Sequence, residues 1–203
     1  MSRYTGPRVK KMRAVGIELP GLSPKKIERR PYPPGQHGQA RKKLSEYAVR
    51  LREKQKIRMN YGVTEKVLRG LMDEARSSKS ETGFKLIELL ERRLDNVVFR
   101  AGFARSIPAA RQLVNHGHFL INGKRVDIPS YRVTKGQVIE VREKSKQLGA
   151  IAAGAAVAGT FQTGWLDVDN ENKKATVSSL PDETSILFEV RVQLVVEFYS
   201  QKL

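Results

Sequence analysis

The dipeptide Asn122-Gly123 constrains the fold of this chain more than any other feature. An apolar run (119–121) precedes it, and a basic pair followed by valine (124–126) comes after it. Asn-Gly between two such runs is the strongest short hairpin signal, because both residues tolerate the positive φ angles of a type I′ turn. The sequence therefore predicts a β-hairpin here and a further strand at 138–141.

A short helix is predicted directly before this hairpin. Ser106 begins it, Pro108 lies in its first turn, where a missing N–H costs little, and Gly117 offers a left-handed cap at its end. The residues that would form its inner face are Ala109, Ala110, Leu113 and Val114. A helix, a turn and a hairpin are thus expected in direct succession.

Three helical patterns precede this unit. Ser45 and Thr64 are suited to cap the first two, and Gly62 is suited to end the first, at 46–61. The expected buried face of the second is Val67, Leu68, Leu71, Met72 and Ala75, and that of the third is Leu86, Ile87, Leu90, Leu94, Val97 and Val98. We expect a kink in the third near Arg92 and Arg93.

The two ends of the chain are less regular. Residues 1–43 are basic, rich in proline and glycine and without hydrophobic periodicity, which predicts an extended arm that does not fold alone. Residues 145–159 are either an alanine-rich helix or a mobile linker, and 165–168 and 175–177 have the pattern of strands. Segment 190–199 fits a strand or a helix, and propensity leaves that choice open.

Basic residues outnumber acidic ones unevenly along the chain. The sequence has 38 Lys and Arg against 21 Asp and Glu, a formal charge of +17. Residues 1–60 have 17 basic and 4 acidic side chains, whereas residues 151–203 have 4 and 7. Because such an excess favours a polyanionic partner, we expect the N-terminal three quarters to face nucleic acid. A membrane partner is not favoured, because prolines break the basic N-terminal stretch and the most apolar run is too short to span a bilayer.

The sequence offers no constellation for catalysis, a metal or a cofactor. It contains no cysteine, which fits a reducing intracellular compartment and removes disulfides and thiolate ligands. The three histidines lack metal-ligand companions at useful spacing, and the glycines fit neither a dinucleotide fingerprint nor a Walker loop. We therefore expect no enzyme, metal or cofactor.

Structured RNA is the expected ligand, and residues 92–141 are the expected centre of its recognition. Basic and amide side chains there can bind phosphates and 2′-hydroxyls at a junction, while the arm and first helix add non-specific affinity. An ordinary solvated face, or an arm without a specific role, is the alternative. The expected RNA-binding residues are Arg3, Arg8, Lys10, Lys11, Arg13, His37, Arg41, Lys42, Lys43, Arg50, Arg52, Lys54, Lys56, Arg58, Tyr61, Arg92, Arg93, Arg105, Arg111, Gln112, Asn115, His116, His118, Lys124, Arg125, Tyr131 and Arg132.

Four stretches of the sequence resemble one protein family. Residues 93–133 (RLDNVVFRAGFARSIPAARQLVNHGHFLINGKRVDIPSYRV) closely resemble the RNA-binding motif of small-subunit ribosomal protein four. Residues 32–38 (YPPGQHG) are similar to its N-terminal signature, 165–168 to the strand after the motif, and 195–200 (VVEFYS) to its C-terminal ending. The resemblance spans nearly the whole chain in the family's order.

This resemblance implies an α+β fold. Its parts are a basic extended arm (1–44), a helical domain (45–91 with about 186–203) and an inserted α/β domain (92–185), with the RNA-binding motif at about 92–150. It also implies that 190–199 is a helix returning to the first domain. Many relatives hold zinc through cysteines in the arm, and the lack of cysteine here means that no zinc site is carried over.

The resemblance also implies partners and a location. The family binds small-subunit (16S type) ribosomal RNA at a multi-helix junction of the 5′ domain and nucleates assembly of the subunit body. It contacts ribosomal protein five at an interface tied to translational accuracy and lies near the path by which messenger RNA enters. Some members repress their own messenger RNA. The implied location is the ribosome, in a bacterial cytoplasm or in an organelle stroma or matrix.

Two other functions use the same small motif. In some pseudouridine synthases a catalytic aspartate follows Arg-Leu, and Arg93-Leu94-Asp95 mimics that triplet. Asp95 is instead expected to be a helix-start charge or the partner of a nearby arginine, because no large catalytic domain follows it. A stress-response or stalled-ribosome factor would be shorter and would lack the YPPGQHG and VVEFYS stretches.

Overall fold

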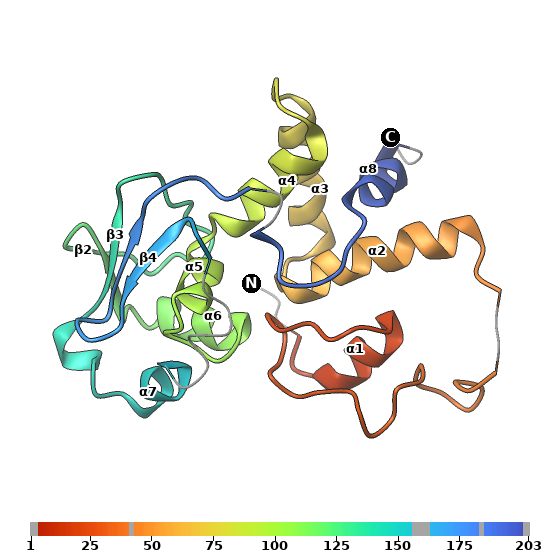
Figure 1. The fold of residues 1–203 in the computed structure, drawn as a ribbon, viewed down its shortest axis with the longest axis horizontal. Helices are drawn as coiled ribbons and strands as arrows, with labels where there is room; N and C mark the ends of the chain where they lie inside the picture. The colour runs from red at the N-terminus through yellow and green to blue at the C-terminus, as the bar shows by residue number, and fades with distance from the viewer. Residues whose placement is uncertain (1–3, 41–42, 156–162, 183–184, 201–203) are drawn as a thin grey trace. The chain divides into compact units, whose positions relative to one another are not determined.

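The chain forms two compact units in a computed structural model that describes residues 4–40, 43–155, 163–182 and 185–200. Unit 1 comprises Met1–Leu86 and Ile186–Leu203, and unit 2 comprises Ile87–Ser185. The described part of unit 1 is helical, whereas unit 2 combines helices with a five-stranded antiparallel sheet (Figure 1). The fold is α+β, as the sequence predicted.

Unit 1 is built mainly from α2 (Glu46–Asn60), α3 (Glu65–Arg76), the first half of α4 (Thr82–Glu91) and α8 (Val192–Ser200). Ser45 Oγ accepts a hydrogen bond from Ala48 N at 3.3 Å, and Thr64 Oγ1 accepts one from Val67 N at 3.4 Å. Each satisfies a donor that the first turn of a helix leaves free, so both predicted N-caps are confirmed.

The buried face of α3 departs from prediction at one position. Leu68, Leu71, Met72 and Ala75 are buried, but Val67 is 41% exposed. The expectation for Val67 was wrong because this residue lies at the edge of the apolar stripe, where the helix turns toward solvent.

A short helix in the N-terminal segment was not expected. Helix α1 (Arg8–Val15) ends at Gly16, whose φ is +76°, and its N–H donates to Met12 O. Met12, Val15, Leu19 and Leu22 form a small core against which Met59 and Phe188 pack. The prediction of an extended arm is therefore wrong for residues 8–15, where local apolar residues, joined by the distant Met59 and Phe188, give the helix a core to pack against.

The expected kink near Arg92 is a complete break between α4 and α5 (Leu94–Arg100). At the break, Leu94 N donates to Tyr131 O at 2.8 Å and Val133 N donates to Arg92 O at 2.9 Å. The backbone thus exchanges helix hydrogen bonds for pairing with a distant segment. All six apolar residues of the predicted stripe are buried.

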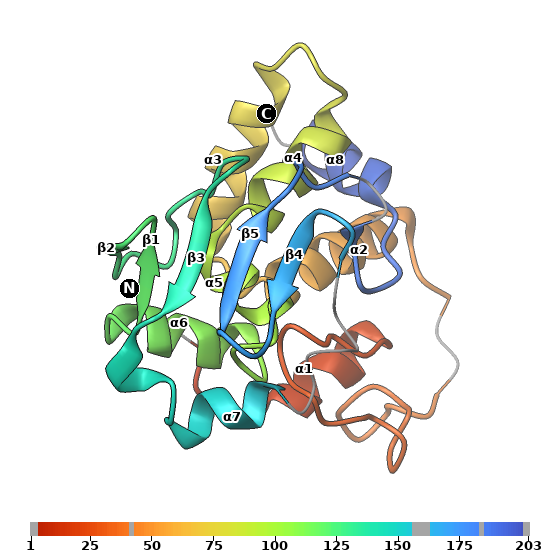
Figure 2. The same ribbon diagram turned by 60° about the vertical axis from the view of Figure 1, so that its left-hand side comes forward.

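Unit 2 contains a sheet in the order β2-β1-β3-β5-β4, with all neighbours antiparallel. Its strands are β1 (Phe119–Ile121), β2 (Lys124–Arg125), β3 (Val138–Val141), β4 (Leu166–Asp169) and β5 (Lys174–Val177). One face buries alternate residues, namely Phe119, Ile121, Ile139, Val141, Ala175 and Val177. Helices α5 and α6 (Ile107–Asn115) lie behind the sheet in Figure 2.

The hairpin and the helix before it are confirmed. Asn122 and Gly123 have φ angles of +48° and +78°, as a type I′ turn requires, and Ile121 pairs with Lys124 across it. Gly117 follows α6 with a φ of +71°. The strands predicted at 138–141, 165–168 and 175–177 appear as β3, β4 and β5, the last two with slightly shifted ends.

The alanine- and glycine-rich segment forms helix α7 (Gly149–Ala155) after a short 3-10 turn, η1 (Glu143–Ser145). Ile151 and Gly154 of this helix are buried. A Cβ at Gly154 would lie 2.5 Å from Ala104 N and 2.6 Å from Gly102 O. Helix α7 therefore packs directly on the backbone of the loop between α5 and α6. The helix alternative holds for 149–155, and residues 156–159 lie outside the described residues.

Segment 190–199, for which propensity allowed either a strand or a helix, is helical and forms α8 from Val192. Val195, Phe198 and Tyr199 are buried at helical spacing. The helix packs against α2 and α3. The helix implied by the family resemblance is confirmed.

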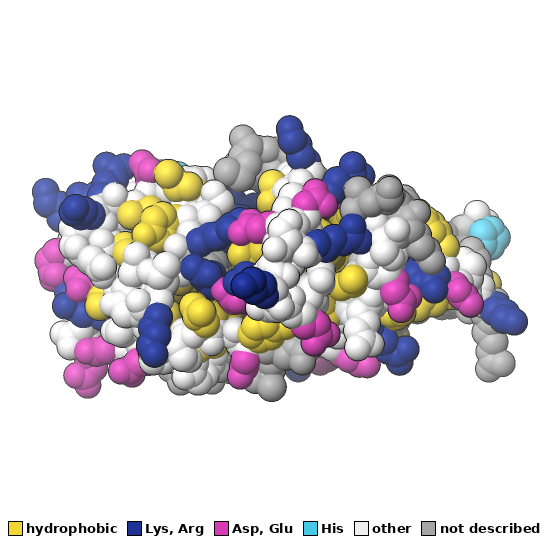
Figure 3. Space-filling view, turned by 90° about the horizontal axis from the view of Figure 1, so that it is seen from above, with side chains coloured by type: hydrophobic (Ala, Val, Ile, Leu, Met, Phe, Trp, Pro, Cys, Tyr) yellow, Lys and Arg dark blue, Asp and Glu magenta, His cyan; other side chains and the backbone are white. Residues whose placement is uncertain are grey.

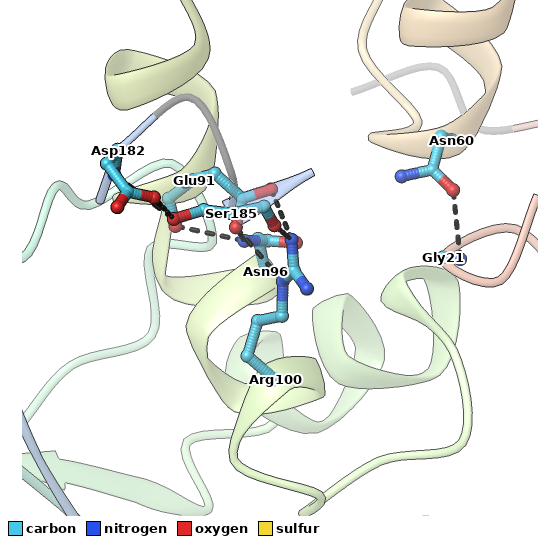
Figure 4. A network of polar contacts seen from close by, with 7 residues as sticks. All are labelled: Gly21, Asn60, Glu91, Asn96, Arg100, Asp182 and Ser185. Atoms are coloured by element: carbon cyan, nitrogen blue, oxygen red, sulfur yellow. Dashed lines mark hydrogen bonds and ion pairs between the residues drawn. The ribbon is translucent and has the colours of Figure 1, made fainter. Parts of the chain in front are cut away.

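A buried polar network joins the two ends of unit 2. Arg100 donates from Nε and Nη2 to the Glu91 carboxylate at 3.0 and 2.7 Å, and it also donates to Ser185 O. Asn96 Nδ2 donates to the same carboxylate at 2.7 Å (Figure 4). Glu91 follows soon after the first residue of unit 2 and Ser185 is its last, so one guanidinium group binds both ends.

Candidate nucleic-acid interface

The helix, turn and hairpin of unit 2 present a polar, mainly basic surface. Among the expected RNA-binding residues, those exposed there are Arg105, Gln112, Asn115, His116, Lys124, Arg125 and Arg132, while His118 is half-buried. They come from the residue before the N-cap of α6, from α6 itself, from the turn after it and from strand β2, except for Arg132, which lies in the segment between β2 and β3. Guanidinium, ammonium and amide groups at these positions can donate hydrogen bonds to phosphates and riboses.

Three other predicted RNA-binding arginines of this unit are engaged inside the protein. Arg93 donates to both oxygens of Asp95, at 3.1 and 2.9 Å, and Arg111 reaches Asp95 Oδ2 at 2.6 Å. Arg92 donates to Glu88 and to Val133 O, each at 2.8 Å. Each guanidinium group thus neutralises a buried carboxylate inside the protein, and direct RNA contacts from these three arginines stay a prediction.

The environment of Asp95 does not favour a catalytic role. Its side chain is fully buried and its carboxylate is bound by two guanidinium groups. An aspartate that reacts with a substrate needs access to it, which this geometry denies. The expected role of Asp95 as the partner of an arginine is confirmed.

Tyr131 was expected to stack on an unpaired base. It is half-buried, and its hydroxyl accepts a hydrogen bond from Gln137 Nε2 at 2.9 Å. This bond holds the ring next to the turn that leads into β3.

The basic residues of the N-terminal segment fall into two groups. Arg13 Nε donates to Tyr32 O at 3.0 Å while its guanidinium group lies 5.1 Å from the Tyr32 ring centroid, and Arg8 donates to Leu22 O at 3.5 Å. These two arginines hold the segment together. Lys10, His37 and Lys43 are exposed, and Lys11 lies over the Tyr4 ring. Arg3, Arg41 and Lys42 lie outside the described residues.

His37 lies in a tight turn formed by the YPPGQHG stretch. Gly35 has a φ of +115°, and Gly38 N donates to Gly35 O at 3.3 Å. A Cβ on Gly38 would clash with Pro33 O. The two glycines therefore allow a compact loop that presents His37 to solvent.

Helix α2 holds several predicted RNA-binding residues away from solvent. Lys54 is 5% exposed and pairs with Glu65 at 2.9 Å, and Lys56 is 8% exposed and pairs with Glu53 at 2.7 Å. Tyr61 is 1% exposed. The side chains of these three residues pack inside unit 1, which leaves little surface for a ligand, and their expected contacts with RNA stay a prediction.

Three arginines of α2 remain closer to the surface. Arg50 pairs with Glu197 at 2.8 Å, and Arg58 lies 3.6 Å from Glu65. Arg52 is half-buried. Helix α2 thus offers fewer cations to a ligand than its sequence suggests.

Sequence reasoning missed Arg142, Arg29 and Arg30. Arg142 follows β3, and its Nη1 donates to Gly117 O at 3.2 Å, which brings it to the turn after α6. Arg29 and Arg30 are exposed in the N-terminal segment. The position of Arg142 just past a predicted strand was a usable signal, but its proximity to Gly117 depends on strand pairing.

Basic and acidic side chains alternate on the face seen in Figure 3, where dark-blue Lys and Arg lie among magenta Asp and Glu. The cations on this face therefore do not form one uniform patch.

Among the described residues, no cluster of His, Asp and Glu is arranged to hold a metal ion, and no helix is long and apolar enough to cross a membrane.

Comparison with known proteins gives family matches along the chain. Residues 3–91 match the ribosomal protein S4/S9 N-terminal domain, and residues 92–139 match the S4 domain. Small ribosomal subunit protein uS4 of Methylobacillus flagellatus is 53% identical, with 100% of each chain covered. The proteins of the same name from Synechococcus sp. (strain JA-3-3Ab) and Cutibacterium acnes are each 50% identical, with at least 99% of each chain covered. The chain therefore belongs to the family of small ribosomal subunit protein uS4.

Proposed function

We propose that this protein is a structural component of the small ribosomal subunit that binds small-subunit ribosomal RNA. The observation that carries this function is the match to proteins of that name over their whole length, at 53% identity in one case. The exposed donors of the helix, turn and hairpin suit contacts with phosphates and 2′-hydroxyls. Its place of action is the ribosome in a bacterial cytoplasm.

We propose finer partners on the strength of the family resemblance. The RNA site is a multi-helix junction of the 5′ domain, where binding nucleates assembly of the subunit body. The direct contacts come from exposed residues such as Arg105, Lys124 and Arg125, together with Lys10, His37 and Lys43 of the N-terminal segment. Ribosomal protein five and messenger RNA near its path into the ribosome are neighbours through which the protein affects translational accuracy.

Salt dependence of binding to an isolated 5′-domain RNA tests this function. The logarithm of the association constant should fall with the logarithm of salt concentration by about 0.7 to 0.9 per phosphate contact. A scrambled duplex of the same length serves as the control RNA. Equal affinity for both RNAs, or affinity that is flat in salt, would overturn the proposal.

An RNA-modifying enzyme is not favoured. Asp95 is enclosed by Arg93 and Arg111, and the relatives compared bear the name of a ribosomal protein. A short stress factor is not favoured either, since the relatives match over their full length, including the YPPGQHG and VVEFYS stretches.

A further inference from the structure

Two guanidinium groups, one from strand β2 and one from the residue after β3, meet at Gly117, in the turn between α6 and β1. A Cβ built on Gly117 would lie 2.6 Å from Arg125 Cζ, so the Arg125 guanidinium group lies directly against this glycine. Arg142 Nη1 donates to the carbonyl oxygen of the same residue at 3.2 Å. Gly117 is thus a point at which two positive charges converge.

The next residue, His118, has a ring that is fixed in place. Its Nδ1 lies 2.9 Å from Ser145 Oγ of η1, and its carbonyl oxygen accepts a hydrogen bond from Arg142 N at 2.9 Å. The His116 ring centroid is 6.0 Å from that of His118. Because Nδ1 is engaged by Ser145, Nε2 is the nitrogen that can bind a ligand.

The charges that face His118 are mostly positive. Burial, and then the charges of His116, Arg142 and Arg125, lower the pKa of His118 below its ordinary 6.5. Two carboxylates on the adjoining segments have cationic partners: Asp127 lies 4.0 Å from Arg125 itself, and Glu143 pairs with Lys146 at 2.8 Å. Within the described residues, no carboxylate forms an ion pair with Arg142 or His118.

We propose that this turn binds one phosphate of the RNA backbone between Arg125, Arg142 and the ring of His118, and that binding is coupled to proton uptake by His118. The proposal rests on the proposed RNA-binding function. A guanidinium group matches the geometry of phosphate oxygens, and a protonated imidazole adds a further charged donor. An anion here offsets the mutual repulsion of the clustered cations.

The sign of the pH dependence follows from the charges. Neighbouring cations disfavour the protonated form of His118 in the free protein, and a bound phosphate reverses that effect. The pKa of His118 is therefore higher in the complex, and the protein takes up a proton on binding at a pH between the two values. RNA affinity should rise as pH falls through this window, by about tenfold for each unit between the two pKa values.

Binding of the full chain to the 5′-domain RNA, measured between about pH 5.5 and 8.5 at fixed salt, tests the coupling. His118→Gln should flatten the pH profile, whereas Lys135→Gln, at an exposed lysine to which no RNA contact is assigned, should retain it. Arg142→Gln should weaken binding and reduce the salt slope by about 0.7 to 0.9, and Lys135→Gln, in the turn before the first residue of β3, should change the slope less.

An NMR titration of His118 in the unsubstituted chain, free and RNA-bound, tests the proposal without any variant. A higher pKa in the complex is the expected result. This inference alone is overturned if the pKa of His118 is unchanged, or if His118→Gln leaves the pH profile intact, while the unsubstituted chain still prefers the 5′-domain RNA. If the unsubstituted chain binds the 5′-domain RNA no better than the scrambled duplex, the proposed function is overturned instead.

Discussion

Arg100 and Glu91 form an ion pair inside unit 2 in which Nη2 lies 2.7 Å from Oε1 and the side chains are 2% and 0% exposed. The Glu91 carboxylate also accepts a hydrogen bond from Asn96. Removing one partner of such a pair leaves the other charge buried without compensation, which is costlier than removing both.

Arg100→Met should therefore lower the free energy of unfolding of unit 2 by about 3 to 5 kcal/mol. Chemical denaturation followed by circular dichroism measures the loss. The double variant Arg100→Met, Glu91→Gln should be more stable than the sum of the two single losses predicts. Strict additivity of the two losses would show that the charges do not interact.

Gly154→Ala should destabilise unit 2, although alanine is normally favoured over glycine in a helix by about 1 kcal/mol. The new Cβ would meet Ala104 N and Gly102 O, which are backbone atoms and cannot swing aside. Gly149→Ala in the same helix is the matched control, since a Cβ there has open space. Thermal unfolding of both variants compares them, and a Gly154→Ala protein as stable as the control would contradict close packing of α7.

Glu65 should make the stability of unit 1 sensitive to acid. Burial alone would raise the pKa of Glu65, but hydrogen bonds from Lys54 and Tyr199 outweigh it and lower the pKa below its ordinary 4.5. A carboxylate whose pKa is lowered by folding stabilises the fold fully at pH values above its pKa in the unfolded chain. This stabilisation is lost as the pH falls through the lower pKa of the folded chain.

Glu65→Gln should consequently destabilise the chain at pH 7, and its difference from the unsubstituted protein should shrink below about pH 4. Urea unfolding at several pH values gives both curves. Glu28→Gln, at an exposed ion pair, is the control and should follow the unsubstituted protein closely. A difference that stays constant down to pH 3 would rule out this linkage.

Substitution of an exposed lysine should weaken RNA binding, whereas substitution of a buried lysine should lower stability. Lys124→Gln should weaken binding to the 5′-domain RNA and reduce its salt slope by about 0.7 to 0.9 while leaving stability unchanged, because Lys124 is exposed on β2. Lys56→Met should instead lower stability, by about 3 to 5 kcal/mol, because Glu53 stays buried without its cation. If Lys56→Met reduced the salt slope of a folded protein, the assignment of Lys56 to the interior would be wrong.

Features that depend on a few neighbouring residues were predictable from the sequence. Ser45 and Thr64 cap helices through bonds to residues three positions away, and Asn122-Gly123 joins two strands that are adjacent in sequence. Contacts between distant residues were not predictable in this way. Lys56 appeared to be one more cation on a basic helix, yet it donates to Glu189 O, 133 positions away.

The same distinction explains the N-terminal segment and the recognition surface. Helix α1 forms because Met59 and Phe188 complete its small core, and neither residue is near it in sequence. Arg111 fits an RNA contact by position on α6, but Asp95, sixteen residues earlier, binds it. Charge and motif predicted the surface, whereas the tertiary fold determines which of its cations are exposed.

The hydrogen bonds that Arg100 donates to Glu91 and to Ser185 have a consequence for engineering. Unit 2 brings its own first and last segments together through side chains that it contains. A cassette cut at 87 and 185 would therefore keep its ends adjacent without help from the rest of the chain. It could be grafted into a surface loop of an unrelated host protein through short spacers, carrying its basic hairpin with it.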